Sequence, residues 1–200
     1  MTENDWIAHW QRVARRIRVP LGFATAALYL FELWRRVPDP RAAAWSVVLV
    51  IPGLWLRGYA SGYVKKNQEL TITGPYAWVR NPLYLGSILI AAGFAVALMS
   101  WAVALALTVM FVAIYVPVIA SEERFLRATF PGFDAYCRQV PCLIPRLGPA
   151  RALPGTEKGG FSLALYLKHR EYNSLLGAIL LYLSLVVLRP ALSELLRGRP

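Results

Sequence analysis

The chain has 200 residues, of which 57% are hydrophobic and 16% charged, and its formal net charge is +11. Soluble domains usually carry about 25% charged residues, so this composition excludes an ordinary soluble domain. The basic residues lie between apolar runs, which favours anionic lipid headgroups over nucleic acid as their partner. We therefore expect an all-α integral membrane protein, with residues 1–200 forming a single domain.

Residues 1–18 precede the first apolar run and have an amphipathic pattern. Their large apolar residues fall near one helical face, namely Trp6, Trp10, Val13 and Ile17. Arginines occupy much of the remaining surface. This pattern is typical of an interfacial helix that lies in the plane of the membrane surface.

A transmembrane helix needs ~20 predominantly apolar residues, and snorkelling Arg or interfacial Trp can extend a shorter run. On this basis we expect a helical bundle of about five transmembrane helices, at residues 20–34, 42–56, 83–98, 101–120 and 174–188. A Pro52-Gly53 pair is expected to interrupt the second span. Glu32, near the end of the first span, is interpreted as an interfacial carboxylate.

The run from Asn81 to Ser121 contains no Asp, Glu, Lys, Arg or His in its 41 residues. It is long enough for two helices, which we expect to turn at Met99-Ser100-Trp101. Both ends of this hairpin then emerge on the same side of the bilayer. The residues that flank it, although far apart in sequence, are thereby brought to one membrane face.

The distribution of Lys and Arg predicts the orientation. With the N-terminus in the cytoplasm, 16 of these residues fall on the cytoplasmic side and 6 on the other. The positive-inside rule therefore favours this arrangement. We expect a multi-pass protein of a bacterial inner membrane, with both flanks of the hairpin facing the cytoplasm.

Two polar signatures flank the hairpin. The first is Gly74-Pro75-Tyr76-Ala77-Trp78-Val79-Arg80-Asn81-Pro82-Leu83-Tyr84-Leu85-Gly86. The second runs from Glu122-Glu123-Arg124-Phe125-Leu126 through Phe130, Phe133, Tyr136 and Val140-Pro141 to Ile144-Pro145-Arg146. Together they resemble the isoprenylcysteine carboxyl methyltransferase and phospholipid methyltransferase family of integral membrane enzymes. The resemblance covers residues 70–148, which we expect to form the core of the cofactor site, followed by C-terminal helices within residues 161–189.

The resemblance implies an S-adenosylmethionine-dependent methyltransferase. Eukaryotic carboxyl methyltransferases of the family typically have His after the Arg, whereas this chain has Asn81, as many bacterial members do. The acceptor it implies is lipophilic or membrane-embedded: an isoprenylcysteine-like carboxylate, a phospholipid amine or an isoprenoid lipid. The alternatives are a small thiol as acceptor, a non-enzymatic lipid-binding or transport-like protein, and a nicotinamide-dependent enzyme similar to the sterol reductases, which share a related membrane architecture.

The side chains of the signatures fit the cofactor's groups. Arg80 can form a fork to the methionyl carboxylate, and Glu122 or Glu123 can accept from the ammonium or the ribose hydroxyls. Aromatic faces can flank adenine or the sulfonium. The predicted cofactor-binding residues are Tyr76, Arg80, Asn81, Pro82, Tyr84, Gly86, Glu122 and Glu123, with Trp78 as a further aromatic candidate.

We assign catalytic roles to Arg80 and Glu122. Methyl transfer is an in-line displacement, for which the protein mainly positions the two reactants and removes water from around them. Only an amine acceptor needs a base, and a Glu can supply it. Arg170, Glu171 and Tyr172, just before the last span, are predicted to bind the acceptor headgroup. A juxtamembrane anchor is the alternative for this segment.

Other chemistries are not indicated. The chain has neither a Walker-type phosphate loop nor a G-x-G-x-x-G fingerprint. His9 and His169 lie far apart, so we predict no metal site. Cys137 and Cys142 are expected on the cytoplasmic side, where a disulfide is not favoured, and no nearby His activates either thiol.

Overall fold

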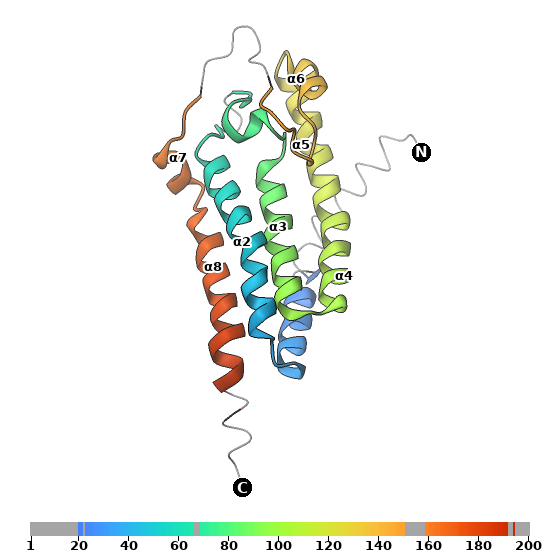
Figure 1. Cartoon of the computed structure of the whole chain (residues 1–200). Coiled ribbons are helices and arrows are strands. Elements are labelled where there is room, and N and C mark those ends of the chain that lie inside the picture. The colour runs from blue at the N-terminus through green and yellow to red at the C-terminus, as the bar shows by residue number, and fades with distance from the viewer. Residues whose placement is uncertain (1–19, 22, 66–68, 151–158, 192–193, 195–200) are drawn as a thin grey trace, which may run out of the picture. The chain divides into compact units, whose positions relative to one another are not determined.

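The computed structural model describes residues 20–21, 23–65, 69–150, 159–191 and 194, and every regular element within them is a helix (Figure 1). The all-α prediction is confirmed. The predicted interfacial helix at residues 1–18 lies outside the described residues. After a helix at residues 20–35, in which residue 22 is not described, the chain forms α2 (Pro40–Ser61), η1 (Gly74–Ala77), α3 (Pro82–Leu98), α4 (Trp101–Met110), η2 (Phe111–Tyr115), α5 (Val116–Thr129), α6 (Phe133–Gln139), α7 (Leu163–Lys168), α8 (Tyr172–Leu183) and η3 (Ser184–Leu188).

All five regions expected to span the membrane are helical, and three described helices are long and apolar enough to cross it. These are α2, the continuous helix Trp101–Thr129 and the helix Tyr172–Ala191. The remaining apolar helix of the hairpin, α3, has 17 residues. The fourth predicted span ended at Ala120, but its helix continues to Thr129. Glu122 and Glu123 therefore lie inside α5 and not at a helix end.

The described chain divides into two compact units. Unit 1 comprises residues 1–51, 90–121 and 176–200, and unit 2 comprises residues 52–89 and 122–175. Both polar signatures and the turn before α8 belong to unit 2. The candidate site can therefore be built within that unit alone.

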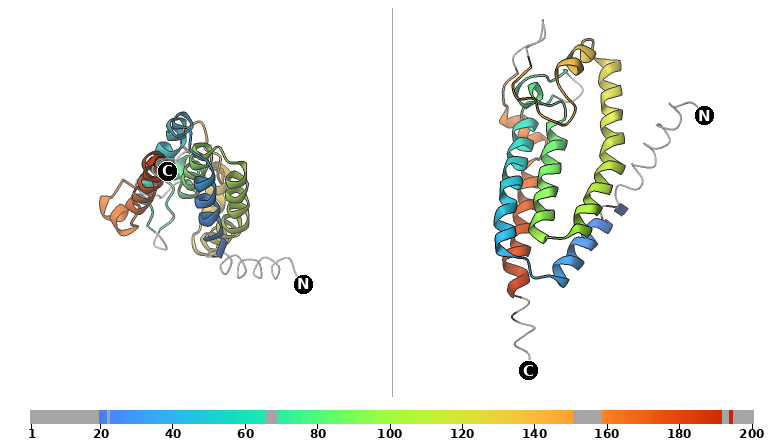
Figure 2. Two further views of the ribbon diagram at one scale, coloured as in Figure 1. Left: turned by 90° about the horizontal axis from the view of Figure 1, so that it is seen from below. Right: turned by 45° about the vertical axis from the view of Figure 1, so that its right-hand side comes forward.

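In unit 1, the hairpin turns where the sequence predicted. Met99 adopts a left-handed conformation with φ of 49°, and the Ser100 hydroxyl accepts from the Val103 N–H at the start of α4. A serine N-cap satisfies one of the free donors of a helix start. Arg36 donates to the Met99 carbonyl at 3.1 Å. The short connection between α3 and α4 is visible in Figure 2.

Glu32 in unit 1 has a more specific environment than the expected interfacial one. It is 4% exposed and its carboxylate lies 2.9 Å from Arg36 Nε and 3.7 Å from Arg35 Nη1. Arg189 donates to the carbonyls of Leu33 and Trp34 at 2.7 and 2.6 Å. Arginines therefore neutralise the buried carboxylate and satisfy carbonyls at the end of the first helix.

Prolines explain two irregular helical turns and one wrong prediction. The π-helical turn η2 precedes Pro117, and η3 precedes Pro190. A proline ring clashes with the carbonyl four residues earlier, and a wider turn relieves the clash. The predicted interruption at Pro52-Gly53 is wrong, because α2 continues through Pro52. A proline removes one backbone N–H donor, but the hydrogen bonds of the neighbouring turns maintain the helix, and transmembrane helices tolerate such prolines.

In unit 2, α2 and α3 approach closely at Gly86. A Cβ at this position would lie 2.6 Å from Arg57 Cγ and 2.7 Å from the Gly53 carbonyl oxygen. Figure 2 shows the two helices side by side. Small residues allow such backbone contact between membrane helices. Gly86 is thus a contact residue of the α2–α3 pair.

The second signature supplies the apolar core of unit 2. Ile72, Phe133, Tyr136 and Val140 are buried together, with Leu70, Leu126, Cys137 and Ala150 packed around them. The Tyr136 hydroxyl donates to the Tyr76 carbonyl at 2.8 Å. This core attaches α6 to the turn η1 that carries the first signature.

Candidate active site

The two signatures lie along one another in unit 2. The Arg80 N–H donates to the Pro141 carbonyl at 2.9 Å, the Asn81 N–H to Cys142 at 3.2 Å, and the Arg146 N–H to Trp78 at 3.0 Å. These backbone bonds hold the end of the second signature against the residues just before α3. The meeting of the two signatures expected from the sequence is therefore present.

Arg80 forms the centre of this region. Its Nη2 lies 3.1 Å from Glu123 Oε1, with the two side chains 15% and 19% exposed, and its Nη1 donates to the Cys137 carbonyl at 3.2 Å. Burial alone lowers the Arg80 pKa, but the Glu123 charge and smaller contributions outweigh it, so the pKa is raised. Arg80 is a permanent cation here.

The Arg80–Glu123 pair retains hydrogen-bonding capacity. Arg80 Nε is buried and has no hydrogen-bond partner among the described residues, and the same holds for Glu123 Oε1. The pair is therefore held by charge at 3.1 Å and not by an aligned hydrogen bond. A buried guanidinium donor without a partner costs free energy unless a ligand satisfies it. An incoming carboxylate fits this donor.

Glu122 meets the first signature at a second point. The Tyr84 hydroxyl, from the first turn of α3, donates to Glu122 Oε1 at 3.0 Å. Glu122 is exposed, and no ion pair to it is present among the described residues. Of the two adjacent carboxylates, Glu123 is thus neutralised by Arg80, whereas Glu122 remains an accessible acceptor.

Tyr76 is buried in η1 next to these carboxylates. Burial raises the pKa of its phenol above the ordinary value, and the charges of Glu122 and Glu171 raise it further. The phenol therefore stays protonated at neutral pH and lies within electrostatic range of carboxylates from α5 and from the turn before α8. Its hydroxyl can act as a donor.

The remaining residues of the first signature mainly shape the site. The Asn81 side-chain amide donates to the Cys142 carbonyl at 3.2 Å and approaches its sulfur at 3.4 Å. Pro82 is buried and begins α3, as suits a first helical position. Gly86 contacts α2, whereas Trp78 is 40% exposed.

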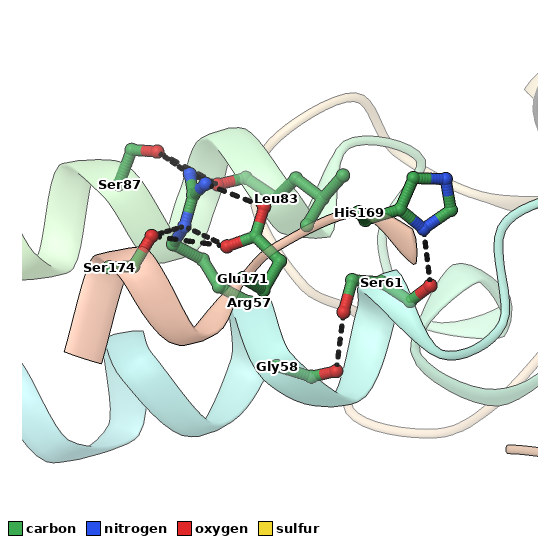
Figure 3. A network of polar contacts seen from close by, with 8 residues as sticks. All are labelled: Arg57, Gly58, Ser61, Leu83, Ser87, His169, Glu171 and Ser174. Carbon is green, nitrogen blue, oxygen red and sulfur yellow. Dashed lines mark hydrogen bonds and ion pairs between the residues drawn. The ribbon is translucent and has the colours of Figure 1, made fainter. Parts of the chain in front are cut away.

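The predicted acceptor residues occupy the turn between α7 and α8. Arg170 is exposed and has φ of 54°, and Tyr172 is exposed at the start of α8. Glu171 instead turns toward α2, where Arg57 Nη2 lies 2.9 Å from its Oε1 (Figure 3). The three residues are adjacent in sequence, but only Arg170 and Tyr172 are exposed.

From the sequence, Arg57 was recognised only as one of the basic residues that predict the orientation. The second span was expected to end at Leu56, but α2 continues to Ser61 and places Arg57 inside the helix. A charged residue inside a membrane helix usually has a partner and a functional reason. Its position directly after an apolar run was the available signal, but its partner, 114 residues away, was not predictable.

Two further features concern the cysteines and the side chains that could bind a metal ion. Cys137 and Cys142 are free thiols, and burial raises the Cys137 pKa, although Arg80 opposes the effect. The Cys137 thiol is therefore protonated at neutral pH. Within the described ranges, no three His, Cys, Asp or Glu side chains gather to form a potential metal site.

Comparison with known proteins relates part of the chain to a family. Residues 43–132 match the family described as Phospholipid methyltransferase. The chain is 40% identical over 94 residues to the cobalt-zinc-cadmium resistance protein CzcN of Cupriavidus metallidurans, covering 47% of this chain and 43% of that protein. It is 38% identical over 99 residues to the nickel-cobalt-cadmium resistance protein NccN of Alcaligenes xylosoxydans xylosoxydans, covering 50% and 46%.

The chain thus spans less than half the length of these curated relatives. No solved structure matches it. The region matched by the family includes most of α2, both helices of the hairpin and Glu122-Glu123. It therefore contains the Arg80–Glu123 and Tyr84–Glu122 contacts. Residues 43–132 thus form a phospholipid methyltransferase domain, of a family that is part of the isoprenylcysteine carboxyl methyltransferase-like membrane methyltransferases.

Proposed function

We propose that this membrane protein is an S-adenosylmethionine-dependent methyltransferase whose acceptor is lipophilic or membrane-embedded. The observation that carries the proposal is the joining of the two signatures by the Arg80–Glu123 and Tyr84–Glu122 contacts, at 3.1 and 3.0 Å. Both contacts lie in the region matched by a methyltransferase family.

The donor set fits the cofactor. Arg80 Nε, buried and without a hydrogen-bond partner among the described residues, would bind the methionyl carboxylate. Glu122 is an exposed acceptor for the ammonium or the ribose hydroxyls. Tyr76, Trp78 and Tyr84 would offer aromatic faces to the cationic sulfonium. When bound, the cofactor supplies a methyl group already attached to a good leaving group.

The residues of the chain then have mainly positioning roles. Arg80 and Glu123 would orient the cofactor, and the Asn81 side chain holds the loop at Cys142 through its hydrogen bond to the Cys142 carbonyl. A carboxylate or thiolate acceptor needs no base at neutral pH. An amine acceptor must lose a proton, and we assign this role to Glu122, whose carboxylate accepts from the Tyr84 hydroxyl.

The acceptor is proposed to be amphiphilic and to enter sideways from the bilayer. Burial of each lipid methylene is worth ~0.8 kcal/mol, so a long chain concentrates the acceptor in the membrane without help from the protein. Weak headgroup contacts then suffice. Isoprenylcysteine-like carboxylates, phospholipid amines and isoprenoid lipids satisfy this condition.

The test is cofactor binding followed by labelled methyl transfer. Purified protein in detergent should bind S-adenosylhomocysteine in calorimetry, and native membranes supplied with methyl-labelled S-adenosylmethionine should yield a labelled lipid. Undetectable binding would reject the methyltransferase proposal and favour a non-enzymatic lipid-binding protein. Equal turnover of a small water-soluble thiol would reject lateral entry and favour a small-thiol methyltransferase.

We further propose a multi-pass arrangement with the site facing the cytoplasm, on the basis of the 16 to 6 distribution of Lys and Arg. Ser100 is buried as an N-cap, so Trp101, 90% exposed, is the better probe of the hairpin turn. With both native cysteines replaced by alanine, Trp101→Cys in intact cells should react with an impermeant thiol reagent, whereas Lys65→Cys should not. The reverse labelling would overturn the orientation.

A further inference from the structure

The turn between α7 and α8 is attached to α2 at two points. His169 Nδ1 lies 3.0 Å from the Ser61 carbonyl oxygen. Two residues further on, Glu171 accepts from Arg57 Nε at 3.0 Å and from Arg57 Nη2 at 2.9 Å. Figure 3 shows both attachments on the same stretch of α2. The turn is therefore held on either side of Arg170.

Arg57 has further partners that complete its role. Its Nη1 donates to the Leu83 carbonyl at 3.2 Å and to the Ser87 hydroxyl, both on α3. Its Nε also approaches the Ser174 hydroxyl at 3.2 Å, and that hydroxyl donates to Glu171 at 3.1 Å. A planar guanidinium with several fixed donors is well suited to join segments in one geometry. Here it joins α2, α3 and the start of α8.

Arg170, between the two attachments, adopts φ of 54°. This left-handed conformation is uncommon for a residue other than glycine and persists only where surrounding contacts impose it. The Arg170 N–H donates to the Leu167 carbonyl and its own carbonyl accepts from the Asn173 N–H, and the contacts of His169 and Glu171 hold the chain on either side of it. Their effect is to leave the Arg170 side chain exposed while its neighbours are tied to α2.

We propose that Arg57 is a positioning residue that fixes the turn of residues 169–174 through Glu171 and so presents Arg170 and Tyr172 to the acceptor headgroup. The headgroup part rests on the proposed function. Glu171 then belongs to the support of the acceptor site and not to its binding surface. The charge of Glu171 contributes to the raised pKa of the buried Tyr76 phenol. Glu171 is therefore within electrostatic range of a predicted cofactor-binding residue.

The first test is local hydrogen exchange, which needs neither cofactor nor acceptor. The amides of Asn173 and Ser174 donate to the Arg170 and Glu171 carbonyls, each at 3.0 Å. Arg57→Gln should raise exchange at these amides by about tenfold, because the local opening they report becomes easier. The matched control is Arg127→Gln, which removes an exposed ion pair to Asp134 in the same unit and should leave them unchanged.

The second test separates the acceptor from the cofactor. The acceptor probes are N-acetyl-S-farnesylcysteine and phosphatidylethanolamine vesicles. Arg57→Gln should raise the apparent KM for whichever probe is methylated by about tenfold. The affinity for S-adenosylhomocysteine should stay within about twofold of wild type. Arg57→Lys should recover part of the loss. Glu171→Gln should reproduce the effect, and the double variant should be no worse than Arg57→Gln alone, since both changes remove the Arg57–Glu171 interaction.

The outcomes are distinguishable. Unchanged exchange at Asn173 and Ser174 would overturn the positioning role, as would a uniform rise in exchange throughout unit 2, which would make Arg57 a general stability residue. If Arg57→Gln fails to fold, Glu171→Gln and Ser174→Ala carry the same test. Absence of S-adenosylhomocysteine binding to the wild type would end the proposed function, while the exchange data alone would still decide whether Arg57 fixes the turn.

Discussion

Replacing Arg80 by glutamine is expected to weaken S-adenosylhomocysteine binding by about 10- to 100-fold, the usual value of a charge-assisted hydrogen bond to a carboxylate. The buried Nε of Arg80, without a hydrogen-bond partner among the described residues, is the donor that this change removes. Arg80→Lys should recover little of the affinity, because an ammonium keeps the positive charge but lacks the planar, forked donors of a guanidinium. Calorimetry in detergent measures both affinities.

A control is needed because Arg80→Gln also leaves Glu123 without its cation. The two side chains are mostly buried and 3.1 Å apart, and an unpaired buried charge is itself destabilising. The double variant Arg80→Gln/Glu123→Gln removes both charges and should recover thermal stability but not cofactor affinity. Recovery of the affinity in the double variant would mean that Arg80 acts only as the partner of Glu123.

Gly86→Ala is expected to lower the stability of the protein by about 1–3 kcal/mol, the range typical of overpacking. The new Cβ would meet the Gly53 carbonyl oxygen at 2.7 Å and Arg57 Cγ at 2.6 Å. The carbonyl belongs to the backbone of α2 and cannot swing away as a flexible side chain does. Within unit 2, α2 and α3 must therefore separate, which also disturbs Arg57.

The matched control is Gly58→Ala, in α2, the helix that Gly86 of α3 contacts within unit 2. Its nearest neighbour would be Tyr166 Cε2 at an ordinary 3.5 Å, so the substitution should be neutral or stabilising by up to about 1 kcal/mol through helix propensity. The midpoint of thermal unfolding in detergent measures both variants. Equal midpoints for Gly86→Ala and Gly58→Ala would contradict the close contact at Gly86.

The family resemblance and the structure bear on different parts of the proposal. The resemblance depends on residues 70–148 and indicates the type of reaction. Arg57 and Ser61 precede that segment but lie within the matched residues 43–132, whereas the turn 169–174 attached to them lies outside both ranges.

Local pattern and composition were enough to determine the helical class, the places of the apolar helices and the turn at Met99-Ser100. They also determined that the residues around Arg80 meet Glu122-Glu123, because an uncharged hairpin must return its ends to one side. These features follow from hydrophobic length and from nearby residues, which a sequence shows directly.

Tertiary structure alone decided how the polar groups are divided among partners. It paired Arg80 with Glu123 and Tyr84 with Glu122, placed Gly86 against Gly53, and turned Glu171 away from its neighbours toward Arg57. It also extended α2 past Pro52 and α5 past Ala120. The physical reason is that a side chain in a buried polar region is satisfied by whichever donor or acceptor packing brings within about 3 Å, and such partners are distant in sequence.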